Sequence, residues 1–152
     1  PGVGDGARAA ADWIAAGGST TPVPELLAPA DVVVDALFGI GLTRPLEGAA
    51  AAAVTAINQQ NAPVLAVDLP SGLCADRGRV LGTAVRATAT VTMLTGKPGL
   101  LTGEGPALTG ALTLAPLLER GETEPIEAPD VELIGPGWLA QWLPPRKRTA
   151  HK

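Results

Sequence analysis

Residues 31–68 decide the fold, and they read DVVVDALFGIGLTRPLEGAAAAAVTAINQQNAPVLAVD. Two short apolar runs lie near the ends of this stretch: 31–35 is bounded by aspartates, and 63–67 leads into Asp68. Valine-rich runs of this length between polar residues are typical of strands that are buried on both faces, as in a parallel sheet. We therefore expect two parallel strands here.

A glycine-rich loop and an alanine-rich helix are predicted between the two strands. The loop covers 38–48, and the helix covers 49–60 with Val54 and Ile57 on one side. Strand, loop, helix and strand in this order form a βαβ unit, whose crossover is almost always right-handed.

Further elements are predicted on both sides of this unit: a helix at 5–16, strands at 89–94, 111–114 and 131–134, a helix at 137–143, and a linker from Pro144 to Arg148. Alternation of strands with helical segments predicts an α/β domain with a mostly parallel sheet.

Composition narrows the class of protein. The chain has 152 residues, 46% of them hydrophobic, which is enough for one domain with a core. Its net charge of -4 argues against nucleic acid as a partner, because phosphates need a basic surface. We expect no membrane partner, since no apolar run reaches the roughly 20 residues of a membrane span. The single Cys74 excludes an internal disulfide and favours a cytoplasmic location.

The chain begins at Pro1 and ends at Lys152 without a leader, so we expect a fragment of a longer protein.

Two aspartates follow the two predicted strands of the βαβ unit. Asp35 closes the first strand and Asp68 follows the second. The carboxyl ends of parallel strands meet at one edge of the sheet, where open α/β sheets bind their ligands. An aspartate at a strand end is more often a cap or a turn residue. The convergence of both on one edge favours a binding site.

The loops after these aspartates suit an anionic ligand. Gly39 and Gly41 allow a close approach to the backbone, and Arg44 offers a bidentate cation for phosphate. Ser71 offers a hydroxyl after the second strand. A Gly-X-Gly pair alone is a weak signal, and Arg44 alone reads as a surface charge. Lys97 either faces the same site or only forms a turn.

Four motifs occur in order along the chain: Val34 to Gly48 (VDALFGIGLTRPLEG), Val67 to Leu73 (VDLPSGL), Gly78 to Gly82, and Gly96 to Leu101 (GKPGLL). Together they resemble the NAD(P)H-hydrate epimerase family, also known as the YjeF N-terminal domain. The resemblance covers roughly residues 28–114. It implies a Rossmann-like three-layer α/β/α fold with a mostly parallel sheet.

The resemblance also implies an activity, namely epimerisation of the R and S forms of hydrated NADH and NADPH. It implies that Asp35 and Ser71 are ligands of a potassium ion and that Asp68 is the catalytic acid or base and contacts the substrate. It implies a homo-oligomer, a dimer or higher. The other substrate-binding residues it implies are Gly39, Ile40, Gly41, Leu42, Thr43, Arg44 and Pro45.

The sequence departs from the family at its start. The family's Asn-Asn-Gly-Gly-Asp loop, which supplies further ion and phosphate contacts, is absent, so we expect the first βα segment to be missing. The tail from Leu143 to Lys152 resembles the opening of an ADP-dependent NAD(P)H-hydrate dehydratase domain. The resemblance implies that residues 1–135 form the epimerase domain and 136–152 a linker and the start of a dehydratase domain, with ADP as a cofactor of that domain only.

Two alternatives remain open at this point. One is a domain of the same fold that binds a nucleotide, or another partner, without turnover. The other is an NAD-dependent dehydrogenase, which requires a first-strand Gly-X-Gly-X-X-Gly and an acidic residue after the second strand. The glycine motif does not appear in the sequence, which argues against a dehydrogenase.

Overall fold

The computed structural model describes residues 4–21, 29–117 and 133–142. The chain divides into two compact units, Pro1–Leu117 and Leu118–Lys152. In the second unit the described part is the helix α5, Pro136–Trp142, with the residues just before it. The first unit begins with the helix α1, Asp5–Ala15, and contains the sheet. The predicted domain boundary after residue 135 stays a prediction.

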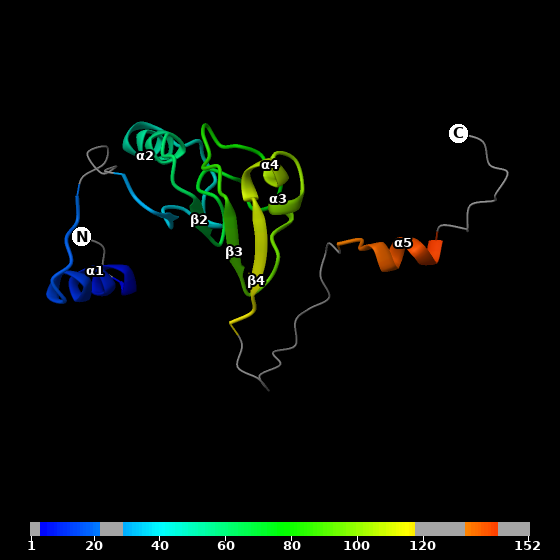
Figure 1. The fold of residues 1–152 in the computed structure, drawn as a ribbon, viewed down its shortest axis with the longest axis horizontal. Coiled ribbons are helices and arrows are strands. Elements are labelled where there is room, and N and C mark those ends of the chain that lie inside the picture. Colours follow the sequence, from blue (N-terminus) through cyan, green and yellow to red (C-terminus); the bar gives the residue numbers. More distant parts are fainter. Residues whose placement is uncertain (1–3, 22–28, 118–132, 143–152) are drawn as a thin grey trace. The chain divides into compact units, whose positions relative to one another are not determined.

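A four-stranded parallel sheet organises the first unit (Figure 1). Its strands lie in the order β1 (Val33–Asp35), β2 (Val64–Val67), β3 (Ala89–Met93) and β4 (Ala111–Ala115). Asp35 is paired with Ala66, and Val67 with Val91. All carboxyl ends therefore lie at one edge, as the predicted α/β fold requires.

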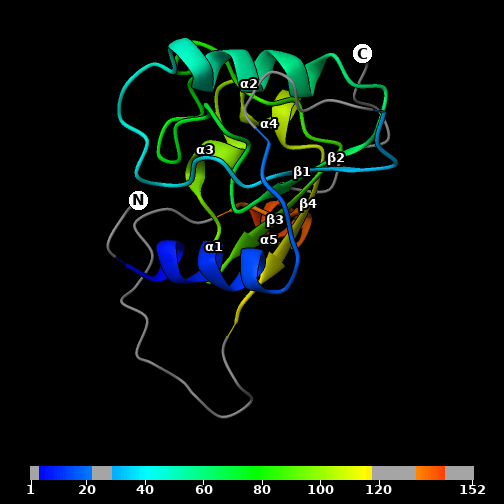
Figure 2. The same cartoon turned by 90° about the vertical axis from the view of Figure 1, so that its left-hand side faces the viewer.

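Helix α2, Gly48–Asn58, covers one face of the sheet at β1 and β2 (Figure 2). Its buried Val54 and Ile57 pack in one cluster with Val64, and Val33 lies against that cluster. Alanine favours the helix, while the two larger side chains supply the apolar stripe that attaches it to the sheet. The predicted helix and the predicted core residues on it are confirmed.

Two short helices, α3 (Pro98–Leu101) and α4 (Gly105–Thr109), follow β3 on the same face. The Thr90 hydroxyl of β3 donates a 2.7 Å hydrogen bond to the carbonyl of Thr109. Leu100 packs with Leu69 and Leu73 in a second buried cluster. The sequence pattern predicts only a turn here, because segments this short carry no helical periodicity.

The opposite face of the sheet is open within the described residues. Val34 is 56% exposed on it, so the expectation that 31–35 is buried on both faces is wrong. The physical reason is that β1 is an edge strand here and Val34 points away from α2. Side chains of β4, at the other edge, are also largely exposed.

The remaining predicted elements have mixed outcomes. Helix α1 and strands β3 and β4 match their predicted ranges to within a residue. The strand expected at 131–134 is not borne out at Leu133 and Ile134, which are neither strand nor helix, and its first two residues lie outside the described residues. The linker at 144–148 also lies outside them. Among the described helices, none is long and apolar enough to cross a membrane.

Candidate functional site at the carboxyl edge of the sheet

A buried pair formed by Asp35 and Ser71 joins the loops that follow β1 and β2. The Ser71 hydroxyl donates to Asp35 Oδ1 at 2.6 Å, and the Ser71 backbone N–H donates to Asp35 Oδ2 at 2.8 Å. The backbone N–H of Phe38 in turn donates to Ser71 Oγ at 3.0 Å. These bonds hold two segments that are 36 residues apart in the sequence in one fixed arrangement.

The same pair has the chemistry of a cation site. Asp35 is completely buried, and no ion pair involves it in the described part of the chain. A buried carboxylate is costly unless an opposite charge or several hydrogen bonds compensate it. Asp35 accepts hydrogen bonds from the Ser71 hydroxyl, the Ser71 N–H and, at 3.4 Å, the Leu37 N–H, and a cation would add the opposite charge. The oxygens gathered here are those of Asp35, Ser71 Oγ and the Phe38 carbonyl, 3.4 Å from Ser71 Oγ. Oxygen ligands of this kind suit a hard cation such as potassium.

Asp68 forms a second centre, at the end of β2. Its backbone has φ 71°, a left-handed conformation that aspartate tolerates better than most residues. Its Oδ1 accepts hydrogen bonds from the Met93 backbone N–H at 3.1 Å and from the Thr92 hydroxyl at 3.2 Å, and an ion pair from Lys97. Strained backbone held by the surrounding structure is common at functional sites.

The environment of Asp68 favours its ionised form. Burial by itself raises the pKa of this carboxyl, but the hydrogen bond from Lys97, the Met93 N–H, the positive charge of Lys97 and the Thr92 hydroxyl together lower the pKa below its ordinary value. At neutral pH the Asp68 side chain is therefore a carboxylate.

The loop after β1 passes directly beside this carboxylate. A methyl group added at Gly39 would lie 3.9 Å from Asp68 Oδ2, and one added at Gly41 would meet no atom within 4 Å. Neither position has a positive φ. The fold itself thus does not require glycine at either position, and the space beside them is open to a ligand.

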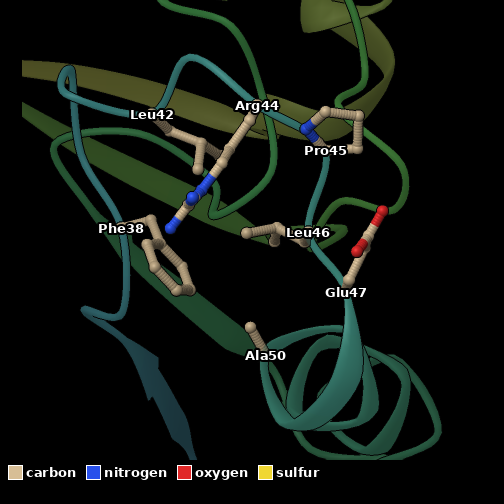
Figure 3. A pocket seen from close by; sticks show the side chains of 7 residues that line it. All are labelled: Phe38, Leu42, Arg44, Pro45, Leu46, Glu47 and Ala50. Atoms are coloured by element: carbon tan, nitrogen blue, oxygen red, sulfur yellow. The ribbon is translucent and has the colours of Figure 1, made fainter.

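A hollow of about 420 Å³ lies farther along this loop, between it and the start of α2 (Figure 3). Figure 3 shows the Arg44 side chain reaching toward the ring of Phe38, with the carboxylate of Glu47 directed away from it. Arg44 is exposed and forms no hydrogen bond or ion pair with the other described residues. Its guanidinium is thus available to an anion. The remaining lining residues are Leu42, Pro45, Leu46 and Ala50.

The structure brings most of the predicted site residues together. Asp35 and Ser71 are in contact, Gly39 lies beside Asp68, and Leu42, Arg44 and Pro45 line the hollow. Adjacent residues, Phe38 and Gly39, connect the two carboxylate centres. The hollow does not include Ile40 or Thr43, whose side chains are exposed.

Two residues at this edge were not predicted as members of the site. Thr92 and Lys97 both contact Asp68 Oδ1. From the sequence, Lys97 is as well explained by a role in a turn as by a position facing the site. The available signal was position: Lys97 comes shortly after the third parallel strand, so it falls at the same carboxyl edge. The sequence indicates a site role for Thr92 only weakly, because Thr92 is one of two threonines that alternate with apolar residues along β3.

Fold and site together define a class: an α/β domain with a parallel sheet and an acidic site at its carboxyl edge, beside a glycine-containing loop. The comparison with known families makes this specific, because the model of the YjeF-related protein N-terminus matches residues 5–99. The chain belongs to this family.

Individual relatives agree with the family match. The chain is 38% identical over 149 residues to the bifunctional NAD(P)H-hydrate repair enzyme Nnr of Vibrio cholerae, covering 97% of this chain and 30% of the relative. It is 49% identical over 92 residues to the NAD(P)H-hydrate epimerase of Limosilactobacillus fermentum, covering 60% of this chain and 44% of the relative. The Nnr enzyme of Moorella thermoacetica is 39% identical over 123 residues, which cover 81% of this chain and 23% of the relative. The chain thus spans less than half the length of these curated relatives.

Proposed function

We propose that this chain takes part in the epimerisation of the R and S forms of hydrated NADH and NADPH, a repair reaction on damaged nicotinamide nucleotides. One observation carries the proposal: an ionised Asp68 lies at the carboxyl edge with Oδ2 facing the Gly39 segment, where an external ligand has room. The names of the relatives, epimerase and bifunctional repair enzyme, support the same activity.

The chemistry requires a proton to move to or from the hydroxyl group on the ring carbon that is inverted. In a ring-opening route, Asp68 takes the hydroxyl proton while the bond from this carbon to the ring nitrogen breaks. The bonding pair goes to the nitrogen, and an aldehyde forms. Rotation and closure on the other aldehyde face, with return of the proton, give the opposite epimer. An ionised carboxylate suits this route, because the step begins with a proton acceptor.

The alternative route removes the hydroxyl group. The carbon–oxygen bond breaks, the ring-nitrogen lone pair forms a carbon–nitrogen double bond, and water adds to the opposite face. This route begins with a proton donor, and a carboxyl with a lowered pKa is a poor donor at neutral pH. We therefore favour ring opening.

The loop from Gly39 to Pro45 is proposed to bind the phosphates of the substrate. Arg44 is the cation of this loop, and its guanidinium has no partner among the described residues. Arginine pairs with phosphate through two parallel hydrogen bonds, which fix orientation as well as affinity. Glycines at 39 and 41 leave the backbone accessible.

A potassium ion is proposed as cofactor, held by Asp35 and Ser71. The buried Asp35 carboxylate without an ion pair in the described part of the chain supports a cation there. A bound cation would compensate this charge and offset part of the negative charge of the nucleotide.

The parent protein is proposed to be bifunctional. The Nnr relatives, which are named bifunctional repair enzymes, match across most of this chain. The second activity is proposed to be an ADP-dependent dehydratase, carried by parts of the parent protein outside these 152 residues. We also propose that the protein forms a homo-oligomer, a dimer or higher. Light scattering after size-exclusion chromatography measures the mass in solution and therefore the number of chains. A cytoplasmic location stays a prediction from the single Cys74.

The test uses one chromatographically purified epimer of hydrated NADH in potassium buffer. We expect the 152-residue chain to convert it to the mixture of epimers, and Asp68→Asn to lose at least about 100-fold in rate, the usual contribution of a general acid or base. Asp31→Asn is the matched control, because Asp31 is exposed before β1 at the opposite edge of the sheet. Equal rates for wild type and Asp68→Asn would refute the role of Asp68.

A further inference from the structure

The two oxygens of the Asp68 carboxylate have different surroundings. Oδ1 accepts three donors: the Lys97 ammonium group, the Thr92 hydroxyl and the Met93 backbone N–H. Oδ2 has no hydrogen-bond partner among the described residues, and a methyl group added at Gly39 would lie 3.9 Å from it. One oxygen is thus fully used by the protein, and the other is presented to the substrate side.

Lys97 is itself fully occupied. Its ammonium group donates to Asp68 Oδ1, to Thr92 Oγ1 at 3.1 Å and to the carbonyl of Met93 at 2.7 Å. An ammonium group has three N–H donors, so none remains for a ligand. The side chain is also only 14% exposed. This arrangement differs from that of a lysine that binds a phosphate directly.

The elements around Lys97 hold it in this position. It follows β3 and precedes α3, whose first residue is Pro98. The contacts to Thr92 and Met93 are local, five and four residues back along the chain, whereas the contact to Asp68 reaches to the neighbouring strand. Lys97 therefore ties the end of β3 to the end of β2.

We propose that Lys97, supported by Thr92, is a positioning residue that fixes the Asp68 carboxylate so that Oδ2 alone acts on the substrate. This inference rests on the proposed function, because it explains how the Asp68 carboxylate is oriented toward the substrate of that reaction. Lys97 holds the carboxylate through Oδ1 and does not touch the nucleotide.

Kinetics separates positioning from substrate binding. Lys97→Met should lower kcat about 10–100-fold, the effect expected from small misplacement of a reacting group. KM for the hydrated nucleotide should stay within about threefold, because Lys97 has no donor left for it. Lys97→Arg should recover part of kcat. Thr92→Val, which keeps the ion pair, should lower kcat less than Lys97→Met does.

Titration tests the contact without any substrate. In the chain labelled with ¹³C at aspartate carboxyls, the resonance lost in Asp68→Asn identifies Asp68. In Lys97→Met the pKa of this carboxyl should rise, because burial remains while the opposite charge is gone. Arg86→Met is the control: Arg86 is exposed and precedes β3 at the opposite edge, so its loss should leave the titration unchanged.

The outcomes are distinguishable. An unchanged Asp68 titration in folded Lys97→Met would overturn the proposal, and so would a higher KM with kcat unaffected. If wild type does not epimerise hydrated nucleotides, the proposed function fails, while the titration still decides whether Lys97 holds Asp68. If Lys97→Met does not fold, Lys97→Gln, which also removes the charge, takes its place, and an unchanged Asp68 titration in that variant would overturn the proposal.

Discussion

Asp68 combines a left-handed backbone with a carboxylate that is held on one oxygen only. The backbone turns at φ 71° immediately after β2, and the neighbouring strand supplies Thr92 and the Met93 N–H to Oδ1. A left-handed residue costs roughly 1–2 kcal/mol relative to the helical or extended regions. The contacts from β3 and Lys97 offset that cost, and they place an ionised group at the sheet edge.

The ion pair of Asp68 makes folding stability depend on pH. Because the pKa of this carboxyl is lower in the folded chain than in the unfolded chain, the folded state binds fewer protons in acid. The stabilisation is present above the unfolded pKa, about 3.9, and is lost as the pH falls through the folded value. Urea unfolding should show the free energy of unfolding falling more steeply below about pH 4 in wild type than in Asp68→Asn. Parallel curves would contradict this.

Asp35 differs from Asp68 in having no cationic partner in the described part of the chain. If potassium supplies that charge, then thermal unfolding at constant ionic strength should give a higher Tm in potassium than in lithium chloride. An ion at 100 times its Kd stabilises by about 2.7 kcal/mol, which corresponds to several degrees for a chain of this size. Asp35→Asn or Ser71→Ala should abolish the difference, and Asp68→Asn should retain it. A Tm that is the same in both salts would argue against the ion.

At the scale of elements, the loop from 38 to 45 and the turn at 70–73 use glycine for different reasons. Gly72 has φ 94°, and a methyl group there would lie 1.9 Å from the Thr83 carbonyl oxygen. Gly39 and Gly41 have no such restriction. The first glycine serves the fold, and the other two leave room beside Asp68 for a ligand.

Alanine substitution separates these two roles. Gly72→Ala should destabilise the chain by more than about 2 kcal/mol, because it combines strain with a backbone clash. Gly39→Ala should change the free energy of unfolding by less than about 0.5 kcal/mol and raise KM for the hydrated nucleotide. Denaturant melts and initial rates measure both. Wild-type KM in Gly39→Ala would remove this loop from the binding site.

The βαβ unit and the shared edge could be predicted because they depend on local patterns. Valine runs, the alanine-rich helix and the position of Asp35 and Asp68 after their strands are all visible in the sequence. The exposure of Val34 could not be predicted, because a valine run looks alike in central and edge strands. The contact of Lys97 with Asp68 spans 29 residues and depends on the register of β2 and β3.

The resemblance to a known family supplied what the patterns could not. Composition and spacing predict an acidic site at the sheet edge, but they do not select a reaction. The match of residues 5–99 to the family model covers three of the four motifs completely and the first four residues of the fourth. Helices α3 and α4 could not be predicted from the sequence, because each contains at most five residues and so shows no helical periodicity.

At the scale of the whole molecule, the first unit carries a sheet with one face covered by α2, α3 and α4 and the site at its carboxyl edge. The anchors of the site come from separate elements: Asp35 from β1, Ser71 and Asp68 from the segment after β2, and Lys97 from the segment after β3. Their arrangement therefore depends on the folded sheet rather than on any single loop.

The most direct test of the account is the interconversion of a single epimer of hydrated NADH, measured alongside binding of the same nucleotide by calorimetry. We predict that the 152-residue chain binds the nucleotide and brings the purified epimer to equilibrium faster than the reaction without protein. Binding without any acceleration, under conditions where the chain is folded, would contradict the account and identify a nucleotide-binding domain without turnover.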